Sequence, residues 1–250
     1  MITMSGHSKW NNIKRKKEKT DAAKAKIFTK IGREISVIVK NGGANPNENS
    51  KLKDAIAKAK AANVPNDNIE RIIKKAAGDG EANNYEELIY EGYGPCGVAV
   101  VVETLTDNRN RTAGEMRHYF DKCGGNLGQS GSVMFMFDRN GIIRIESEGL
   151  DEDTVMEDAL DAGADDFNYD GDVFEISTDP NTLGGVRDAL EDKGDSFISA
   201  EVEYIPQTMT AIDDEEASLK MEKLIDMLEE NDDVQAVWHN WDMPAESEEE

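Results

Sequence analysis

The hydrophobic pattern of this chain changes near residue 80, and this change limits the possible folds more than any other feature of the sequence. Before it, apolar residues recur with the 3.6-residue period of helices. After it, short apolar runs typical of strands alternate with helical segments. A chain of 250 residues with such a change is expected to form two or three small domains. The sequence Gly78-Asp79-Gly80 is typical of a hinge between the two parts.

The charge of the chain divides at the same place. Residues 1–80 contain 18 Lys and Arg against 8 Asp and Glu, a net charge of +10. Residues 81–250 contain 10 against 44, a net charge of -34. The total of -24 would argue against a nucleic-acid partner, but a concentrated basic surface matters more than the total. The first third is therefore the candidate for binding an anionic polymer.

The first 80 residues are expected to form a basic arm followed by a three-helix bundle. Residues 1–20 lack helical periodicity, whereas later isoleucines recur on one side of a helical wheel. Asp67 followed by Glu70 is an aspartate form of the capping box that begins a helix. The expected helices run from Asp21 to Asn41-Gly42-Gly43, from Asn49-Ser50 to Asn63-Val64-Pro65, and from Asp67 to Gly78 as the C-cap. Their expected inward residues are Ile27, Ile31, Ile35, Ile38, Leu52, Ile56, Ala59, Ile69, Ile72, Ile73 and Ala76.

The remainder is expected to form two small α+β domains of the ferredoxin-like, split βαβ kind. Short strands alternate there with helices, which is typical of α+β sandwiches. The sequence Arg139-Asn140-Gly141 between two apolar runs predicts a β-hairpin. The expected strands are 86–91, 98–103, 133–137, 142–146, 173–177, 199–205 and 234–238, and the expected helices are 110–122, 154–162, 183–192 and 215–230.

Motifs for catalysis, metal binding or membrane insertion are missing from the sequence. His7, His118 and His239 are far apart in unrelated elements, and no nucleophile-elbow, zinc-protease or P-loop motif occurs. Cys96 and Cys123 are too few for a disulfide scaffold or a cysteine-rich zinc site. No apolar run approaches the roughly 18–20 residues of a membrane-spanning helix, and no secretory leader precedes the lysines. The sequence therefore predicts a cytoplasmic protein that is not an enzyme, with no catalytic residue, metal or cofactor.

The principal candidate site is a nucleic-acid interface on the arm and the first two helices. Lysine and arginine contact phosphates, and this contact needs density and exposure more than exact geometry. Trp10 is available to stack on a base. The alternative is a basic helix pair that serves only solubility. The candidate residues are Lys9, Trp10, Lys14, Arg15, Lys16 and Lys17 in the arm, Lys26, Lys30, Arg33 and Lys40 in the first helix, and Lys51, Lys53, Lys58 and Lys60 in the second.

A second candidate contact for anions or RNA lies between the strand at 98–103 and the following helix. Arg109 and Arg111 stand there near backbone N–H groups at the start of the helix, and Arg117 follows along it. Structural salt bridging and capping explain this sequence equally well. The glycine-rich stretch 124–131 lacks the lysine of a P-loop and follows a helix, so we interpret it as a tight loop.

Several motifs resemble those of one known family over essentially the whole chain. These motifs are Gly6-His7-Ser8-Lys9-Trp10, Asn68-Ile69-Glu70-Arg71, Tyr90-Glu91-Gly92-Tyr93-Gly94-Pro95, the stretch 107–112, and the stretch 123–127 with Gly131-Ser132-Val133. They are similar to those of the YebC-type family of probable transcriptional regulatory proteins. That family is related to mitochondrial translational activators of cytochrome c oxidase.

The resemblance implies a domain organisation and a function. It implies three domains: 1–80, 81–131 with 206–245, and 132–205 inserted into the second. It also implies a regulator of gene expression that binds nucleic acid, with duplex DNA as the leading partner. A ribosome-associated translation factor that binds ribosomal RNA and relieves stalling is the alternative, and a protein-interaction module is a third. Both nucleic-acid assignments use the same basic surface and stay open here; a monomer without membrane contact is expected.

Overall fold

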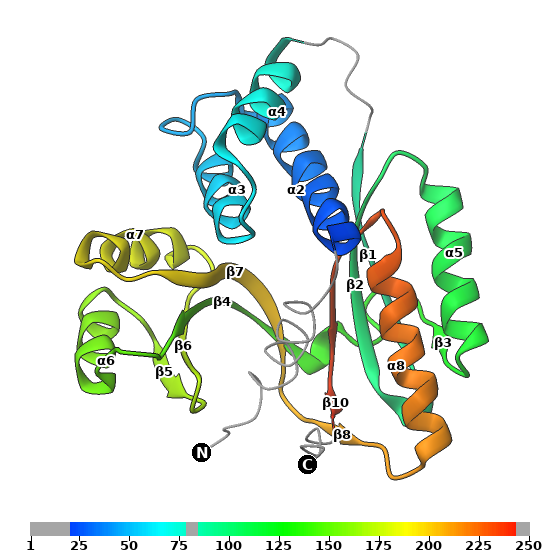
Figure 1. The fold of residues 1–250 in the computed structure, drawn as a ribbon. Coiled ribbons are helices and arrows are strands. Elements are labelled where there is room, and N and C mark those ends of the chain that lie inside the picture. Colours follow the sequence, from blue (N-terminus) through cyan, green and yellow to red (C-terminus); the bar gives the residue numbers. More distant parts are fainter. Residues whose placement is uncertain (1–20, 79–84, 244–250) are drawn as a thin grey trace. The chain divides into compact units, whose positions relative to one another are not determined.

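A computed structural model describes residues 21–78 and 85–243 of the chain (Figure 1). These residues form two compact units. Unit 1 combines the helical segment 21–78 with residues 139–203, and unit 2 combines residues 85–138 with residues 204–243. Each unit is therefore built from segments that are far apart in the sequence.

Three helices open unit 1, as predicted, and surround a small core. They are α2 (Asp21–Gly42), α3 (Ser50–Ala61) and α4 (Asn66–Gly78). Asn49 caps α3 by accepting a hydrogen bond from the Leu52 N–H, and its amide donates to the Gly43 carbonyl over 2.9 Å. One side chain thus fixes both the end of α2 and the start of α3. The buried apolar residues of this core are Ile31, Ile35, Val39, Leu52, Ala55, Ala59, Val64 and Ile69.

The third helix differs from its prediction in two details. It begins at Asn66, so Asp67 lies inside its first turn and the prediction that Asp67 begins the helix is wrong by one residue. A carboxylate in the first turn still interacts favourably with the helix dipole. Of the inward residues predicted for α4, only Ile69 is buried, while Ile72, Ile73 and Ala76 are partly buried against the core, as Ile56 of α3 is.

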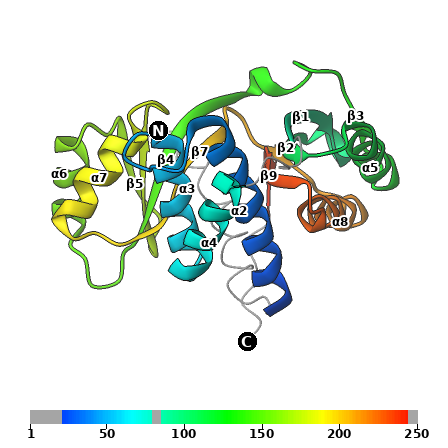
Figure 2. The same ribbon diagram turned by 90° about the horizontal axis from the view of Figure 1, so that it is seen from above.

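An α+β domain forms the rest of unit 1. Its elements are β4 (Phe137–Glu146), α6 (Glu152–Asp161), β5 (Asp166–Tyr169), β6 (Val173–Thr178), α7 (Leu183–Lys193) and β7 (Phe197–Pro206), with β4 and β7 each extending into unit 2. The strand order is β5-β6-β4-β7, and the pairs β5–β6 and β4–β6 are antiparallel. Helices α6 and α7 cover one face of the sheet (Figure 2). This arrangement has the ferredoxin-like βαββαβ pattern that was predicted.

The opposite face of this sheet carries a buried ion-pair cluster. Arg144 of β4 lies between Glu175 of β6, at 2.8 Å, and Glu203 of β7, at 2.6 Å. All three side chains are buried, and the guanidinium makes hydrogen bonds to both carboxylates. The cluster therefore ties together three neighbouring strands through charge-assisted hydrogen bonds.

The predicted hairpin at Arg139-Asn140-Gly141 is wrong. The segment 133–137 is not a strand: a 3-10 turn, η2 (Met134–Met136), precedes β4, which runs without interruption through Gly141. Gly141 is opposite Thr178 in the sheet, and a Cβ atom at Gly141 would lie 2.3 Å from the Thr178 hydroxyl oxygen. The glycine thus permits close packing within a strand, which the sequence pattern did not distinguish from a turn.

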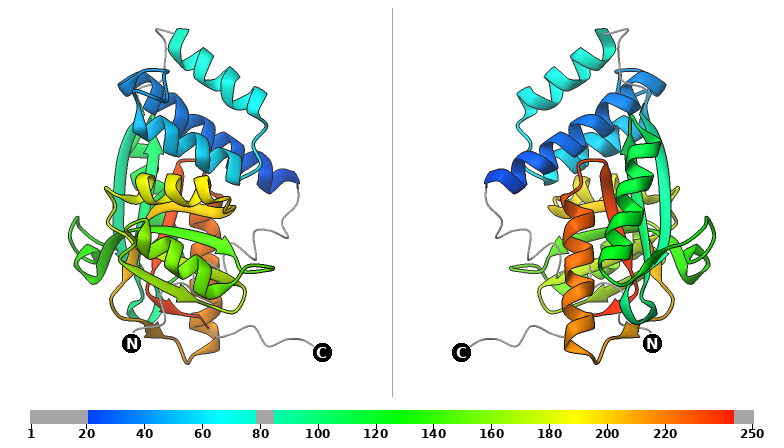
Figure 3. Two further views of the ribbon diagram at one scale, coloured as in Figure 1. Left: turned by 90° about the vertical axis from the view of Figure 1, so that its left-hand side faces the viewer. Right: turned by 90° about the vertical axis from the view of Figure 1, so that its right-hand side faces the viewer.

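Unit 2 contains a second antiparallel sheet with two helices on one face. Its first segment forms β1 (Glu86–Tyr93), η1 (Pro95–Gly97), β2 (Ala99–Thr106), α5 (Arg109–Lys122) and β3 (Asn126–Leu127). Its second segment forms β8 (Thr210–Ala211), α8 (Glu215–Glu230), β9 (Val234–His239) and β10 (Trp241–Asp242). The strand order is β3-β1-β2-β9, and α5 and α8 run side by side (Figure 3). The last strand of the sheet therefore comes from the second segment.

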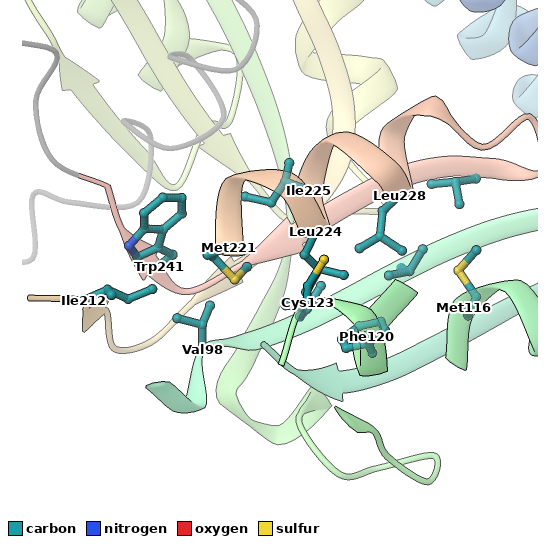
Figure 4. Packing of buried hydrophobic residues seen from close by; sticks show 13 residues of the cluster. Val98, Met116, Phe120, Cys123, Ile212, Met221, Leu224, Ile225, Leu228 and Trp241 are labelled. Atoms are coloured by element: carbon teal, nitrogen blue, oxygen red, sulfur yellow. The ribbon is translucent and has the colours of Figure 1, made fainter. Parts of the chain in front are cut away.

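Strand β2 is buried on both faces along nearly its whole length. Val100 and Val102 point into the core beneath α5 and α8, which also contains Phe120, Met221 and Trp241 (Figure 4). A smaller core on the opposite face contains Ala99, Val101, Val133, Phe137 and Trp238. The compact units divide between 138 and 139 and between 203 and 204, whereas the domain limits 131/132 and 205/206 stay a prediction.

Candidate nucleic-acid interface

The described part of the candidate interface lies on the three N-terminal helices. The arm residues Lys9, Trp10, Lys14, Arg15, Lys16 and Lys17 lie outside the described residues. On α2, Lys26 and Lys40 are exposed, while Lys30 and Arg33 are half-buried. All four of these cations take part in polar or electrostatic interactions within the protein. These four cations are therefore part of a basic helix surface, and none of them is without an interaction inside the protein.

The four candidate lysines of α3 fall into two kinds. Lys51 and Lys60 are exposed, and no carboxylate of the described residues forms an ion pair with them. Lys53 instead pairs with Asp188 of α7. The Lys58 ammonium lies 3.1 Å from Glu34 of α2 and 3.5 Å from Glu201 of β7. Lys51 and Lys60 thus have no carboxylate partner among the described residues, whereas Lys53 and Lys58 are paired with carboxylates of unit 1.

Helix α4 adds cations that were not among the predicted site residues. Lys74 and Lys75 are exposed near its C-terminal end, and neither forms an ion pair with a carboxylate of the described residues. Arg71 is also exposed and donates to the Asn68 side chain over 3.0 Å. These residues belong to the same excess of Lys and Arg in residues 1–80, so the charge count contained the signal. The capping and core pattern of α4 predicts a helix but does not show which of its cations are exposed.

In the second candidate contact, Arg109 and Arg111 at the start of α5 have different roles. Arg111 makes ion pairs with Asp107 at 2.9 Å and with Asp233 at 2.6 Å. Asp233 is buried and also accepts hydrogen bonds from the hydroxyls of Thr106 and Thr112. Burial alone would raise the pKa of Asp233, but the hydrogen bonds from Arg111 and the two threonines lower it below its ordinary value. Arg111 therefore joins β2, α5 and the start of β9.

The other two predicted arginines remain at the surface. Arg109 and Arg117 are exposed on α5, and within the described residues no salt bridge is formed by either guanidinium. Asn108 caps this helix by accepting a hydrogen bond from the Arg111 N–H over 3.1 Å. Arg111 is also 43% exposed, but its guanidinium is already paired with carboxylates, which distinguishes it from Arg109 and Arg117.

The glycine-rich loop uses its N–H groups inside the protein. Glu91 of β1 accepts hydrogen bonds from the N–H groups of Gly131, Val133 and Met134 over 2.6, 2.9 and 2.8 Å. Burial would raise the pKa of Glu91, and these three hydrogen bonds outweigh it and lower the pKa. Within the stretch 124–131, the N–H groups of Gly125 and Gly128 donate to the backbone carbonyls of Phe120 and Glu91. Together with the Gly131 N–H they are used inside the protein, in agreement with the tight-loop interpretation.

The described residues contain neither a membrane-spanning helix nor a cluster of metal-ligating side chains. No helix there is long and apolar enough to cross a membrane. No group of three or more His, Cys, Asp or Glu side chains there could hold a metal ion. His118 is exposed on α5, and His239 is buried in β9.

Fold and charge together define the class: a multidomain α+β protein whose cations are concentrated in an N-terminal helical segment. The chain belongs to the TACO1/YebC family. The model of the TACO1/YebC protein N-terminal domain matches residues 8–79, and that of the second and third domain matches residues 85–241. The resemblance seen in the motifs is confirmed.

Relatives and a solved structure agree with this membership. A protein of Acetivibrio thermocellus named "Probable transcriptional regulatory protein" is 62% identical over 95% of this chain and 99% of its own length. A protein of Finegoldia magna with the same name is 58% identical over 96% of this chain and 99% of its own length. The crystal structure of a conserved hypothetical protein from Aquifex aeolicus is 45% identical, with a TM-score of 0.82 over 93% of this chain and 96% of that one. The predicted fold class is confirmed.

Proposed function

We propose that this protein is a cytoplasmic regulator of transcription that binds duplex DNA through its basic arm and N-terminal helices. The charge distribution carries the proposal, because a net charge of +10 in residues 1–80 contrasts with -34 in the remainder. Lysine is not needed for the solubility of so acidic a chain, so its concentration in one segment favours phosphate binding. The names of the relatives support a regulator rather than an enzyme.

Binding of this kind is electrostatic and does not by itself select a base sequence. Lysines contact phosphate oxygens and position a protein on the duplex, whereas base edges carry the sequence information. The exposed cations Lys51, Lys60, Lys74 and Lys75 lie on two neighbouring helices of unit 1. We expect about six phosphate contacts in total. The logarithm of the association constant for duplex DNA should then fall with the logarithm of the salt concentration with a slope of about -5.

Charge reversal at two exposed lysines tests this proposal in the full-length protein. The Lys51→Glu, Lys60→Glu variant should bind every duplex more weakly and should lower the magnitude of the salt slope by about 2. Affinity is measured by fluorescence anisotropy on unrelated duplexes over a range of salt. The matched control is Lys122→Glu, Lys223→Glu, which makes the same charge change at exposed positions of unit 2. Equal loss of affinity in both variants, or a slope that stays constant, would contradict the proposal.

A translation factor bound to ribosomal RNA is the second candidate function. Arg109 and Arg117 favour it, because these exposed cations offer a contact in unit 2, remote in sequence from the basic helices. Structured RNA presents phosphates and sugar hydroxyls over an extended surface and is recognised by shape. We rank it below DNA because acidic residues predominate in residues 81–250.

A further inference from the structure

Helix α3 carries two adjacent charges whose order is the reverse of the two charges they meet on α7. Lys53 and Asp54 are adjacent on α3, and Arg187 and Asp188 are adjacent on α7. Lys53 pairs with Asp188, while the Arg187 guanidinium lies 2.8 Å from the Asp54 carboxylate. Shifting either helix along the other would place like charges together, so the reciprocal order fixes how the two helices meet.

Burial shows that this contact is built into unit 1. Arg187 is only 2% exposed although it carries a charge, and it makes ion pairs with both Asp54 and Asp188. A buried guanidinium requires such partners because desolvation is costly. Next to this pair of helices, Glu201 of β7 lies 3.5 Å from the Lys58 ammonium. Two of the four candidate lysines of α3 therefore have carboxylate partners in the segment 139–203.

The partner segment is strongly acidic. Residues 139–203 contain 4 Lys and Arg against 20 Asp and Glu, a net charge of -16. A carboxylate and a phosphate present the same kind of anionic oxygen to a lysine. Lys53 and Lys58 cannot give their full charge to a phosphate while Asp188 and Glu201 hold them.

The Lys53–Asp188 pair is weak enough to exchange. The side chains of Lys53 and Asp188 are 52% and 36% exposed, and ion pairs at such positions gain little in water. The Lys58–Glu201 pair is less exposed, at 27% for each side chain, but its 3.5 Å separation is longer than the 3.1 Å between Lys58 and Glu34 of α2. A nucleic acid offers many phosphates and releases counterions when lysines bind it, which favours the exchange at low salt.

We propose that the acidic segment 139–203 competes with nucleic acid for Lys53 and Lys58 of α3. In the free protein, Asp188 and Glu201 pair with two phosphate-binding lysines, Lys53 and Lys58. The phosphates of a bound polyanion replace these carboxylates. This inference rests on the proposed binding of nucleic acid by the helical segment. It adds an autoinhibitory contact that lowers affinity for any weakly charged or short polyanion.

The first test removes the competing charges without removing a lysine. The Asp188→Asn, Glu201→Gln variant should bind a duplex about three- to tenfold more tightly than the wild type, since each exposed pair contributes at most about a factor of five. Its salt slope should be steeper by about 1 because Lys53 is released, whereas Lys58 keeps Glu34 at 3.1 Å. The control is Glu157→Gln, Asp161→Asn, which removes the same charge from exposed positions of α6. An equal gain in both variants, or no gain, would overturn the competition.

The second test follows the ion pairs themselves in the wild-type protein. A carbodiimide joins a lysine directly to a carboxylate that it contacts, so Lys53–Asp188 and Lys58–Glu201 cross-links should form in free protein. Saturating duplex DNA should suppress both, as measured by mass spectrometry of the digested protein. The Lys193–Asp158 pair between α7 and α6 does not involve α3 and serves as the internal control.

The outcomes separate this inference from the proposed function. DNA binding by the wild type with undiminished Lys53–Asp188 and Lys58–Glu201 cross-links overturns the competition and leaves the proposed function intact. Failure of both the wild type and the Asp188→Asn, Glu201→Gln variant to bind DNA overturns both. Binding that appears only in this variant supports the competition in its strongest form.

Discussion

At the scale of single residues, the imidazole of His239 is buried at the end of β9. The backbone N–H of Trp241 donates to its Nδ1 atom over 3.3 Å. Desolvation lowers the pKa of His239 from 6.5 to about 4, against a smaller opposing effect of Glu229. The folded protein therefore holds this imidazole neutral where an unfolded chain would protonate it.

His239 should make the protein less stable in acid. Because its pKa is depressed on folding, the unfolded chain binds the extra proton between pH 6.5 and about 4, and the stabilisation is lost as pH falls through this range. The His239→Gln variant should lack this effect. Between pH 7.5 and 5, its free energy of unfolding should fall by about 2 kcal/mol less than that of the wild type, as measured by urea unfolding. If the free energy of unfolding falls equally in the wild type and the variant over this pH range, the imidazole of His239 is not buried in its neutral form.

Residue types in the sequence identify cations but not their partners. The arginine pair at 109 and 111 suggested a shared anion site, yet Arg111 pairs with Asp233, which lies 122 residues further along the chain. Similarly, α3 shows four lysines in sequence, and only the fold reveals that Lys53 meets Asp188. Long-range partners of this kind depend on tertiary packing, so local spacing cannot predict which charges stay available.

At the scale of elements, hydrophobic periodicity predicted long segments well and short ones poorly. Helix α8 has the predicted limits, 215 and 230, because sixteen residues supply several turns of apolar period and an Asp214 cap. The four-residue strand β5 was not predicted, since so short a run carries little periodic signal. Gly141 was interpreted as part of a turn because glycine in a strand has the same sequence appearance as glycine in a hairpin.

The strand role of Gly141 predicts opposite effects for two glycine substitutions. In Gly141→Ala the new Cβ would also approach the Leu183 Cβ to 2.9 Å, so the variant should lose about 1–3 kcal/mol of stability. Gly114 lies on the exposed side of α5, where a Cβ meets nothing within 4 Å. Gly114→Ala should therefore stabilise the protein by about 0.5–1 kcal/mol through helix propensity. Urea unfolding of both variants measures these changes. An unchanged free energy of unfolding in Gly141→Ala would contradict the close packing of Gly141 within a strand.

At the scale of the whole molecule, charge and motifs carried more information than periodicity. The sequence alone shows the net charges of +10 in residues 1–80 and -34 in residues 81–250. Motifs such as Gly6-His7-Ser8-Lys9-Trp10 correctly predicted the family. Periodicity alone could not show that β9 pairs with β2, because strand pairing over so long a separation leaves no local signal. Only the motif resemblance implied that the last helix and strand return to the earlier sheet.

The choice between DNA and the ribosome also belongs to the whole molecule, because it depends on whether both units bind. A DNA regulator that uses the basic helices does not need α5. The Arg109→Ala, Arg117→Ala variant should then keep its affinity for duplex DNA within about threefold, a change below about 1 kcal/mol. These two exposed arginines can be removed without disturbing the Arg111–Asp233 pair.

A ribosome-bound factor would instead engage RNA through the basic helices and α5 together, since structured RNA is contacted at several places by shape. The same variant is therefore compared with the wild type by sedimentation with ribosomes through a sucrose gradient. We expect Arg109→Ala, Arg117→Ala to leave both DNA affinity and sedimentation unchanged. If the wild type sediments with ribosomes and the variant does not, the two exposed arginines of α5 are a ribosome contact and translation becomes the primary role. Matched thermal unfolding of the two proteins ensures that a loss of sedimentation reports on the surface of α5 rather than on the fold.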